Sequence, residues 1–232
     1  MFKGYNCTLF AYGQTGTGKT HTMTGDLAPS LGTFSINAGI IPRTLYKLFN
    51  LLEQQQQTEY SVRVSYVELY NEELRDLNCL GEPKDGNSLK IYEDNARKGV
   101  VIQGAEESLI KSAQHGIKIL TRGEQRRQIA ATNCNDRSSR SHSIFTITVH
   151  LKEQASLTGS TSNQTVPASK AMEDMLKVGK MNLVDLAGSE NINRSGAKDS
   201  RAREAGMINQ SLLTLGRVIN CLVEKSSHVP YR

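Results

Sequence analysis

A glycine-rich stretch near the N-terminus constrains the fold of this chain more than any other feature. Residues 13–20, Gly-Gln-Thr-Gly-Thr-Gly-Lys-Thr, have the Gly-x-x-x-x-Gly-Lys-Thr spacing of a phosphate-binding loop. In such a loop the glycines let the backbone wrap an anion, the lysine neutralises the terminal phosphates and the threonine hydroxyl binds Mg²⁺. The apolar run Leu9–Tyr12 before the loop predicts a buried strand, and a helix is expected from about Gly18. The sequence therefore predicts a strand–loop–helix unit that binds a nucleoside triphosphate.

The composition sets the size and class of the domain. With 232 residues, of which 38% are hydrophobic, the chain can form one large domain or two small ones with a sizeable core. No apolar run is long enough for a membrane span, and the N-terminus lacks the apolar stretch of a secretory signal, so no membrane partner is expected. The four cysteines are widely spaced and form no C-x-x-C pair, which makes metal binding by thiolates an unfavoured hypothesis. The net charge of +5 suits any acidic partner, whether nucleotide, nucleic acid or protein.

The pattern of apolar residues predicts strands and helices that alternate along the chain. Helices are expected from about Pro42 to residue 52, over 112–127 with Ser112 as N-cap, and over 208–222. A short acidic helix is expected over 72–77, and strands over 60–70, 89–92, 100–102, 145–151 and 181–186. Loops are expected over 25–39 and over the Ser- and Thr-rich stretch 156–169. Intermixed strands and helices favour a layered α/β domain.

Asp185-Leu186-Ala187-Gly188 is a second motif that fits a nucleotide site. A carboxylate at the end of a buried strand is where a nucleotide hydrolase places its metal-coordinating acid. A glycine beside it lets a backbone N–H approach the γ-phosphate. An aspartate that only caps the strand would give the same short pattern, so the motif gains its weight from the phosphate loop.

A third motif that fits a nucleotide site covers residues 135–142, Asn-Asp-Arg-Ser-Ser-Arg-Ser-His. They bring three hydroxyls, two guanidiniums and an imidazole together ahead of an apolar strand. Hydroxyls can ligate Mg²⁺ and orient water, and an arginine can pair with a carboxylate such as Glu190 when the loop closes. A polar loop that caps the strand is the simpler alternative. The chain has no Asn-Lys-x-Asp tetrapeptide, which disfavours a signalling GTPase.

The stretches GQTGTGKTHTM, NDRSSRSH and DLAGSE, in that order, resemble the phosphate loop and the two switch loops of the kinesin motor domain. The resemblance extends over nearly the whole chain. Within the family, the chain is most similar to the bipolar spindle kinesins of the BimC class. This similarity lies in the stretches SYVELYNEELRDL and MINQSLLTLGRVI and in the long loop after the phosphate-loop helix. We name residues 135–142 the first switch and residues 185–190 the second switch.

The resemblance implies a fold, an activity and a set of site residues. The fold would be a P-loop NTPase-type three-layer α/β domain, with a mixed, mainly parallel central sheet and helices on both faces. The activity would be ATP hydrolysis, with Mg²⁺, that drives movement along microtubules. The residues that would bind the nucleotide are Gly13, Gln14, Thr15, Gly16, Thr17, Gly18, Lys19, Thr20 and, near the adenine, His21. Thr20, Ser139 and Asp185 would hold Mg²⁺, the last through water. Ser138 would lie near the γ-phosphate and the attacking water, Gly188 would contact the γ-phosphate through its N–H, and Arg140 and Glu190 would form the bridge that closes the site.

The segment 191–225 resembles the part of kinesins that couples the switches to the track. Its first part, residues 191–217, carries five basic against two acidic residues, which suits an acidic protein surface such as tubulin, although a solvated helix face would look similar. The candidate microtubule contacts are Arg194, Lys198, Arg201, Arg203 and Arg217, with Arg97 and Lys98 as weaker candidates. No nucleic-acid partner is expected. The resemblance also implies a homo-oligomer in the cytoplasm, on the cytoskeleton and the mitotic spindle.

The chain differs from kinesin motor domains at both ends, where family strands and helices are not found. We therefore expect a motor-domain fragment, incomplete at both ends, that alone hydrolyses ATP poorly or not at all. We also expect residues 9–12 to form an exposed apolar sheet edge. Two alternatives remain at this point: a nucleotide-switched binding protein that does not move, and a non-catalytic microtubule-binding module.

Overall fold

The computed structural model describes residues 1–30, 33–55, 58–79, 89–94, 99–133, 137–153, 175–190 and 200–231. Its main sheet has the strand order β1 (Cys7–Ala11), β10 (Met175–Asp185), β9 (His142–Glu153), β4 (Thr58–Tyr70) and β5 (Glu73–Asp76), with β8 (Ser108–Ile110) also paired to β4. Two small hairpins accompany it: β2 (Pro29–Ser30) with β3 (Thr33–Phe34), and β6 (Lys90–Asp94) with β7 (Gly99–Gln103). The helices are α1 (Lys19–Met23), α2 (Ile40–Glu53), α3 (Ala113–Asn133), α4 (Arg137–Arg140) and α5 (Ser200–Val223).

The direction of the strands corrects one expectation. The sheet is mixed, as predicted, but in the described residues only the β1–β10 pair is parallel, and the β10–β9, β9–β4, β4–β5 and β4–β8 pairs are antiparallel. The prediction of a mainly parallel sheet was therefore wrong. Parallel neighbours need a crossover connection, whereas β9 and β10 follow each other along the chain and pair directly over 11 residues.

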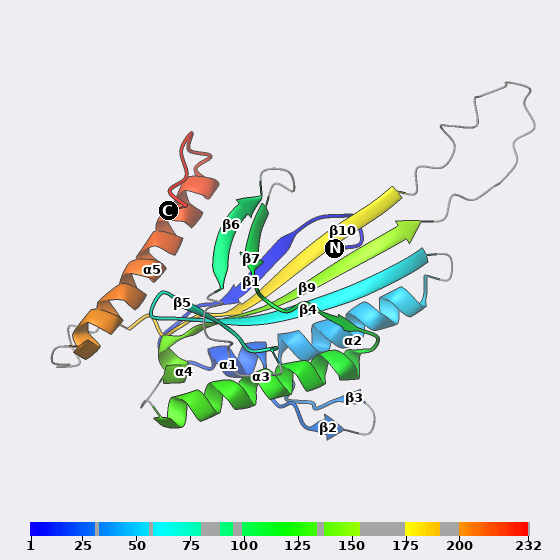
Figure 1. Cartoon of the computed structure of the whole chain (residues 1–232), viewed down its shortest axis with the longest axis horizontal. Coiled ribbons are helices and arrows are strands. Elements are labelled where there is room, and N and C mark those ends of the chain that lie inside the picture. Colours follow the sequence, from blue (N-terminus) through cyan, green and yellow to red (C-terminus); the bar gives the residue numbers. More distant parts are fainter. Residues whose placement is uncertain are drawn as a thin grey trace, which may run out of the picture.

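One face of the sheet forms the core. Figure 1 shows α1, α2 and α3 gathered along this face. The alternation along the strands turns Val64, Phe145 and Leu183 toward the helices, and α2 buries Leu45 and Leu52 against them. Each such side chain stabilises the fold by about 1.5–3 kcal/mol relative to an exposed position. The predicted helix from Pro42 and the predicted strands in β4 and β9 are confirmed.

The opposite face is covered by a helix only near one end of β10, within the described part of the chain. There Leu212 of α5 packs against Leu186 and Ala187. Elsewhere on this face Phe10 and Leu176 are 40% and 62% exposed. β1 is an edge strand among these residues, in line with the expected exposed edge. We expected helices on both faces of the sheet, but in the described residues they cover the second face only in part.

The segment after β4 corrects a second expectation. Residues 72–77 were expected to form a short acidic helix, but Glu73–Asp76 form strand β5, which pairs back onto β4. Asn71 and Glu72 connect the two strands with φ angles of 51° and 62°. Two consecutive left-handed residues are typical of the tight turn whose twist matches a hairpin, and asparagine tolerates that conformation well.

Other expectations concern caps and loops. The Ser112 hydroxyl accepts a hydrogen bond from the His115 N–H at 3.2 Å, which confirms this residue as the cap of α3. The expected loop over 25–39 contains the small β2–β3 hairpin. The Ser- and Thr-rich stretch 156–169 lies outside the described residues. None of the helices in the described ranges is both long and apolar enough to cross a bilayer.

Candidate nucleotide site

The phosphate loop begins where β1 ends, at the carboxyl edge of the parallel β1–β10 pair. The register places Ala11 opposite Asp185, so the loop and the second switch leave the sheet side by side. Gly16 and Gly18 have φ angles of 81° and 92°, a left-handed conformation that disfavours side-chain-bearing residues. Helix α1 starts at Lys19, directly after Gly18, as the sequence predicted. The backbone conformation thus explains two of the glycines in the motif.

The two polar side chains that end the motif have separate partners. The Lys19 ammonium donates to the carbonyl oxygens of Gly13 and Gln14, at 2.9 Å each, across the mouth of the loop. The Thr20 hydroxyl donates to Asp185 Oδ2 at 2.6 Å. Two of the three residues expected to hold Mg²⁺ are therefore in direct contact, although 165 positions separate them in the sequence.

The surroundings of Asp185 fit a hard divalent cation. Asp185 is 4% exposed, and its Oδ1 atom is buried without a hydrogen-bond partner in the described part of the chain. A buried carboxylate oxygen with no partner is costly, and an ion or its bound water would satisfy it. Hydroxyl and carboxylate oxygens are the ligands that Mg²⁺ prefers. The donor set of Thr20 and Asp185 therefore fits the predicted ion, with Ser139 as the predicted third ligand.

The first and second switches are joined to each other through the backbone. The Gly188 N–H donates to the Ser139 carbonyl oxygen at 2.8 Å, and the Ala187 N–H donates to His142 Nδ1 at 3.1 Å. The Gly188 N–H that was expected to contact the γ-phosphate thus has a protein partner. If one switch moves, it must either break these two hydrogen bonds or move the other switch with it. The two switches should therefore respond together to a ligand.

His142 is neutral in this arrangement. Burial, and next the positive charge of Arg127, lower its pKa from 6.5 to about 4. Because Nδ1 accepts the Ala187 N–H, the ring proton lies on Nε2. This role of the imidazole was not predicted from the sequence motif.

Glu190 contacts the phosphate loop. Its carboxylate accepts hydrogen bonds from the Thr15 N–H at 2.9 Å and from the Thr15 hydroxyl at 2.5 Å, and the Ser189 N–H donates to the Gly13 carbonyl at 3.1 Å. Burial acts to raise the pKa of Glu190, but the hydrogen bonds from Thr15 and the charge of Lys19 outweigh it and lower the pKa. The carboxylate is therefore ionised at neutral pH. Its bridge with Arg140 stays a prediction.

A buried cluster under Asp185 was missed by the sequence analysis. Arg127 of α3 is 3% exposed and lies among Glu68, Glu124 and Asp185, with N–O distances of 3.7, 3.4 and 3.9 Å. Burial acts to lower the pKa of Arg127, but Tyr66, Glu124, Asp185 and Glu68 raise it above its ordinary value. The signal available in the sequence was weak: a glutamate inside the otherwise apolar face of β4.

Of the other predicted site residues, the structure describes some fully, some by their backbone alone and some not at all. The backbones of Ser138 and Arg140 lie in α4, but the Ser138 side chain is outside the described part. His21 is exposed on α1. Of the candidate microtubule contacts, Arg217 is exposed on α5, and Arg201 and Arg203 lie in the same helix with undescribed side chains. Arg97, Lys98, Arg194 and Lys198 lie outside the described residues, as do Asn135 and Asp136.

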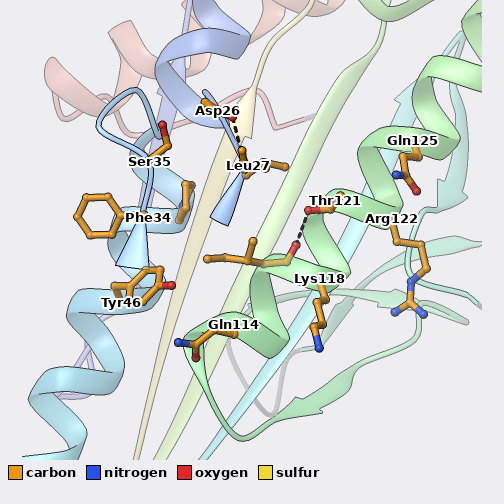
Figure 2. A pocket seen from close by; sticks show the side chains of 13 residues that line it. Asp26, Leu27, Phe34, Ser35, Tyr46, Gln114, Lys118, Thr121, Arg122 and Gln125 are labelled. Atoms are coloured by element: carbon orange, nitrogen blue, oxygen red, sulfur yellow. Dashed lines mark hydrogen bonds between the residues drawn. The ribbon is translucent and has the colours of Figure 1, made fainter. Parts of the chain in front are cut away.

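A separate cavity of about 450 Å³ lies between the 25–39 segment, α2 and α3. Figure 2 shows its lining, with Phe34 and Tyr46 on one side and Lys118, Thr121 and Arg122 of α3 on the other. The Ser35 hydroxyl and the Ala28 N–H lower the pKa of Asp26 at its rim. None of the predicted nucleotide-site residues lines this cavity. The nucleotide chemistry therefore belongs to the phosphate loop, where the polar groups converge.

A family model described as "Kinesin motor domain" matches residues 1–232, the whole chain. The chain is 58% identical over 233 residues to the kinesin-like protein cut7 of Schizosaccharomyces pombe and 56% identical over 236 residues to the kinesin-like protein bimC of Emericella nidulans. It is 50% identical over 237 residues to the kinesin-like protein KIN-5A of Arabidopsis thaliana.

These matches cover all of this chain but 18–21% of each relative, so the chain spans about a fifth of their length. Among solved structures, that of a fast kinesin matches with a TM-score of 0.76 and 41% identity. That match covers 100% of this chain and 58% of the other. The fold and the sequence thus lead to the same family, and the resemblance to bimC-type kinesins is confirmed.

Proposed function

Because this chain belongs to the kinesin motor-domain family, we propose that it binds ATP with Mg²⁺, hydrolyses it and couples the cycle to movement along microtubules. The observation that carries the proposal is the junction of three distant segments at one point. Thr20 of the phosphate loop contacts Asp185 of the second switch, and Gly188 of that switch contacts Ser139 of the first. A site that only binds nucleotide needs the loop; a site that senses hydrolysis needs both switches beside it.

In phosphoryl transfer, some of these residues would position the reacting groups and others would stabilise charge on the phosphates. Bound Mg²⁺ would neutralise charge on the phosphates, held by Thr20, Ser139 and, through water, Asp185. Lys19 would leave the carbonyls of Gly13 and Gln14 to meet the terminal phosphates. Ser138 would orient the attacking water. No strong general base is required, because this reaction depends mainly on positioning and electrostatic stabilisation.

Glu190 and Gly188 would supply the link between hydrolysis and movement. Glu190 accepts a hydrogen bond from the Thr15 N–H, and the Gly188 N–H donates to the Ser139 carbonyl. A γ-phosphate that enters the loop would compete with Glu190 and Ser139 for these two N–H donors. Their release would let Gly188 meet the γ-phosphate and Glu190 pair with Arg140. Helix α5, whose Leu212 packs against Leu186 and Ala187, would carry the change outward.

The proposed track is the acidic surface of the microtubule. Arg217 is exposed on α5, and Arg194, Lys198, Arg201, Arg203, Arg97 and Lys98 complete the proposed contact set. The likeness to the bimC-type relatives supports the proposal that the protein acts on the cytoskeleton and the mitotic spindle as a homo-oligomer.

The test is ATP turnover by the full-length protein with and without microtubules, compared with Thr20→Val and Thr22→Val. Thr20→Val removes the hydroxyl that contacts Asp185 and should lower turnover at least about a hundredfold. Thr22, two residues further along α1 and exposed, is the matched control and should leave turnover unchanged. Turnover that microtubules do not stimulate would count against the proposal.

The two alternatives predict other results. Co-sedimentation with microtubules that becomes stronger in a non-hydrolysable ATP analogue would argue against a nucleotide-switched binding protein that binds a partner without moving. A non-catalytic module would co-sediment equally with and without nucleotide, and Thr20→Val would change nothing.

A further inference from the structure

We propose that Arg127 is a positioning residue for nucleotide hydrolysis, which holds the Asp185 carboxylate in place beside Thr20 and fixes the segment that joins the first switch to the sheet. The inference rests on the proposed function of the site. It concerns a residue of α3 that lies outside all three motifs.

The geometry starts from the register of the sheet. Asp185 of β10 lies opposite Ser143 of β9, and Ser143 lies opposite Glu68 of β4. Residues in register across neighbouring strands point to the same face, so these three polar side chains form a row under α3. Arg127 lies over this row and contacts each member of it.

The guanidinium uses separate nitrogens for separate elements. Nη1 donates to Ser143 Oγ at 3.2 Å and lies 3.9 Å from Asp185 Oδ2, and Nη2 donates to Ser141 Oγ at 3.3 Å. Ser141 is the seventh residue of the first switch. One buried side chain thus joins the end of the first switch to the start of the second.

The contact to Asp185 is shared with the nucleotide site. Asp185 Oδ2 lies between the Thr20 hydroxyl, at 2.6 Å, and Arg127 Nη1, at 3.9 Å. Its Oδ1 atom remains for an ion or its bound water. A planar guanidinium held at several points fixes the carboxylate more strictly than a mobile ammonium would. Arg127 therefore acts on the reaction through Asp185 and not by touching substrate.

Charge gives the same residue a second effect. Arg127 is the positive partner of three carboxylates, those of Glu68, Glu124 and Asp185. Without it, these buried carboxylates would lose their shared positive partner, and the Asp185 carboxylate would no longer be held in one position beside Thr20.

A purely structural role for Arg127 makes a different prediction. If the residue only attached α3 to the sheet, its loss would lower the folded fraction and leave the turnover of each folded molecule unchanged. Arg126 offers the matched control. It is the neighbouring arginine, and its guanidinium donates to the carbonyls of Leu77, at 3.1 Å, and of Cys79.

The experiment measures kcat and KM for Mg²⁺·ATP in the full-length protein, with turnover normalised to the folded fraction by circular dichroism. In Arg127→Met we expect kcat to fall at least about tenfold, with KM changed less than about threefold. Arg126→Met should change kcat less than about twofold. Arg127→Lys keeps the charge but not the planar fork, so its kcat should lie between those of wild type and Arg127→Met.

The outcomes separate the two proposals. A wild-type kcat per folded molecule in Arg127→Met, or an equal fall of kcat in Arg126→Met, overturns the role of Arg127 while the motor function stands. If Arg127→Met does not fold, a Lys variant with wild-type kcat overturns it as well. Wild-type protein without any ATP turnover overturns the proposed function and this inference together.

Discussion

The buried imidazole of His142 makes the stability of this domain depend on pH in a defined window. The pKa of His142 is lowered from 6.5 to about 4 by burial and by Arg127, while the Ala187 N–H uses its Nδ1 as acceptor. The unfolded chain therefore binds a proton at His142 below about pH 6.5, and the folded chain does so only below about pH 4. The contribution is fully present above pH 6.5 and is lost as the pH falls from 6.5 to about 4.

The magnitude follows from the difference between the two pKa values. A pKa difference of about 2.5 corresponds to about 3 kcal/mol of unfolding free energy, and about 2 kcal/mol of it is lost by pH 5. His142→Asn, which keeps an amide oxygen near the position of Nδ1, lacks this dependence. At pH 7.5 the variant should be less stable than wild type by about 1–3 kcal/mol, and this gap should close as the pH falls.

Two measurements check the reasoning. An NMR titration of the ring protons gives the pKa of His142 directly, and urea unfolding of wild type and His142→Asn at several pH values gives the difference in stability. His150→Asn, on the same strand and half-buried, is the control and should follow the wild-type pH dependence. An NMR pKa near 6.5 would refute the account, as would a wild-type-to-variant difference that does not change with pH.

Three glycine substitutions give further predictions. A Cβ at Gly188 would collide with the Glu190 carboxylate, so Gly188→Ala should lower ATP turnover at least about a hundredfold while the circular dichroism spectrum stays native. A Cβ at Gly123 of α3 would collide with the Tyr66 ring, and Gly123→Ala should reduce the unfolding free energy by about 1–3 kcal/mol. Gly216 lies in α5 with no neighbouring atom within 4 Å of the added Cβ, so Gly216→Ala should instead raise the unfolding free energy by about 0.5–1 kcal/mol. Urea unfolding measures both changes. Equal effects of Gly123→Ala and Gly216→Ala on the unfolding free energy would contradict this packing argument.

Local patterns in the sequence predicted most of the elements. The periodicity of Leu45, Leu48 and Leu52 predicted α2, the Ser112 cap predicted the start of α3, and alternation predicted β4 and β9. These features depend on residues that are neighbours in the chain, so one sequence contains them.

The errors arose where pairing between distant segments decides the structure. Glu73–Asp76 formed a strand because β4 offered a partner and Asn71 allowed the turn, a tertiary effect that outweighed the helical tendency of the acidic residues. The strand directions were wrong for the same reason. A phosphate loop indicates one parallel pair, here β1 with β10, and contains no information about how β9 and β4 join it.

The candidate site divides in the same way. Lys19, Thr20 and Asp185 were found because they lie in short motifs, but the bonds that join the switches use backbone N–H groups of Ala187 and Gly188, which every residue except proline possesses. No residue type marks such a donor, so the sequence could not show that the two switches share hydrogen bonds.

Arg127 shows why a motif search stops short of the full site. Its partners lie on α3, β4, β9 and β10, and Glu68 and Asp185 are 117 positions apart in the chain. What brings them together is the register of the sheet, which aligns both carboxylates with Ser143, and the placement of α3 across them. Asp185 Oδ1, which belongs to this cluster, has no partner in the described residues. A divalent cation or its bound water would satisfy it, so the cluster around Arg127 and the expected metal share the Asp185 carboxylate.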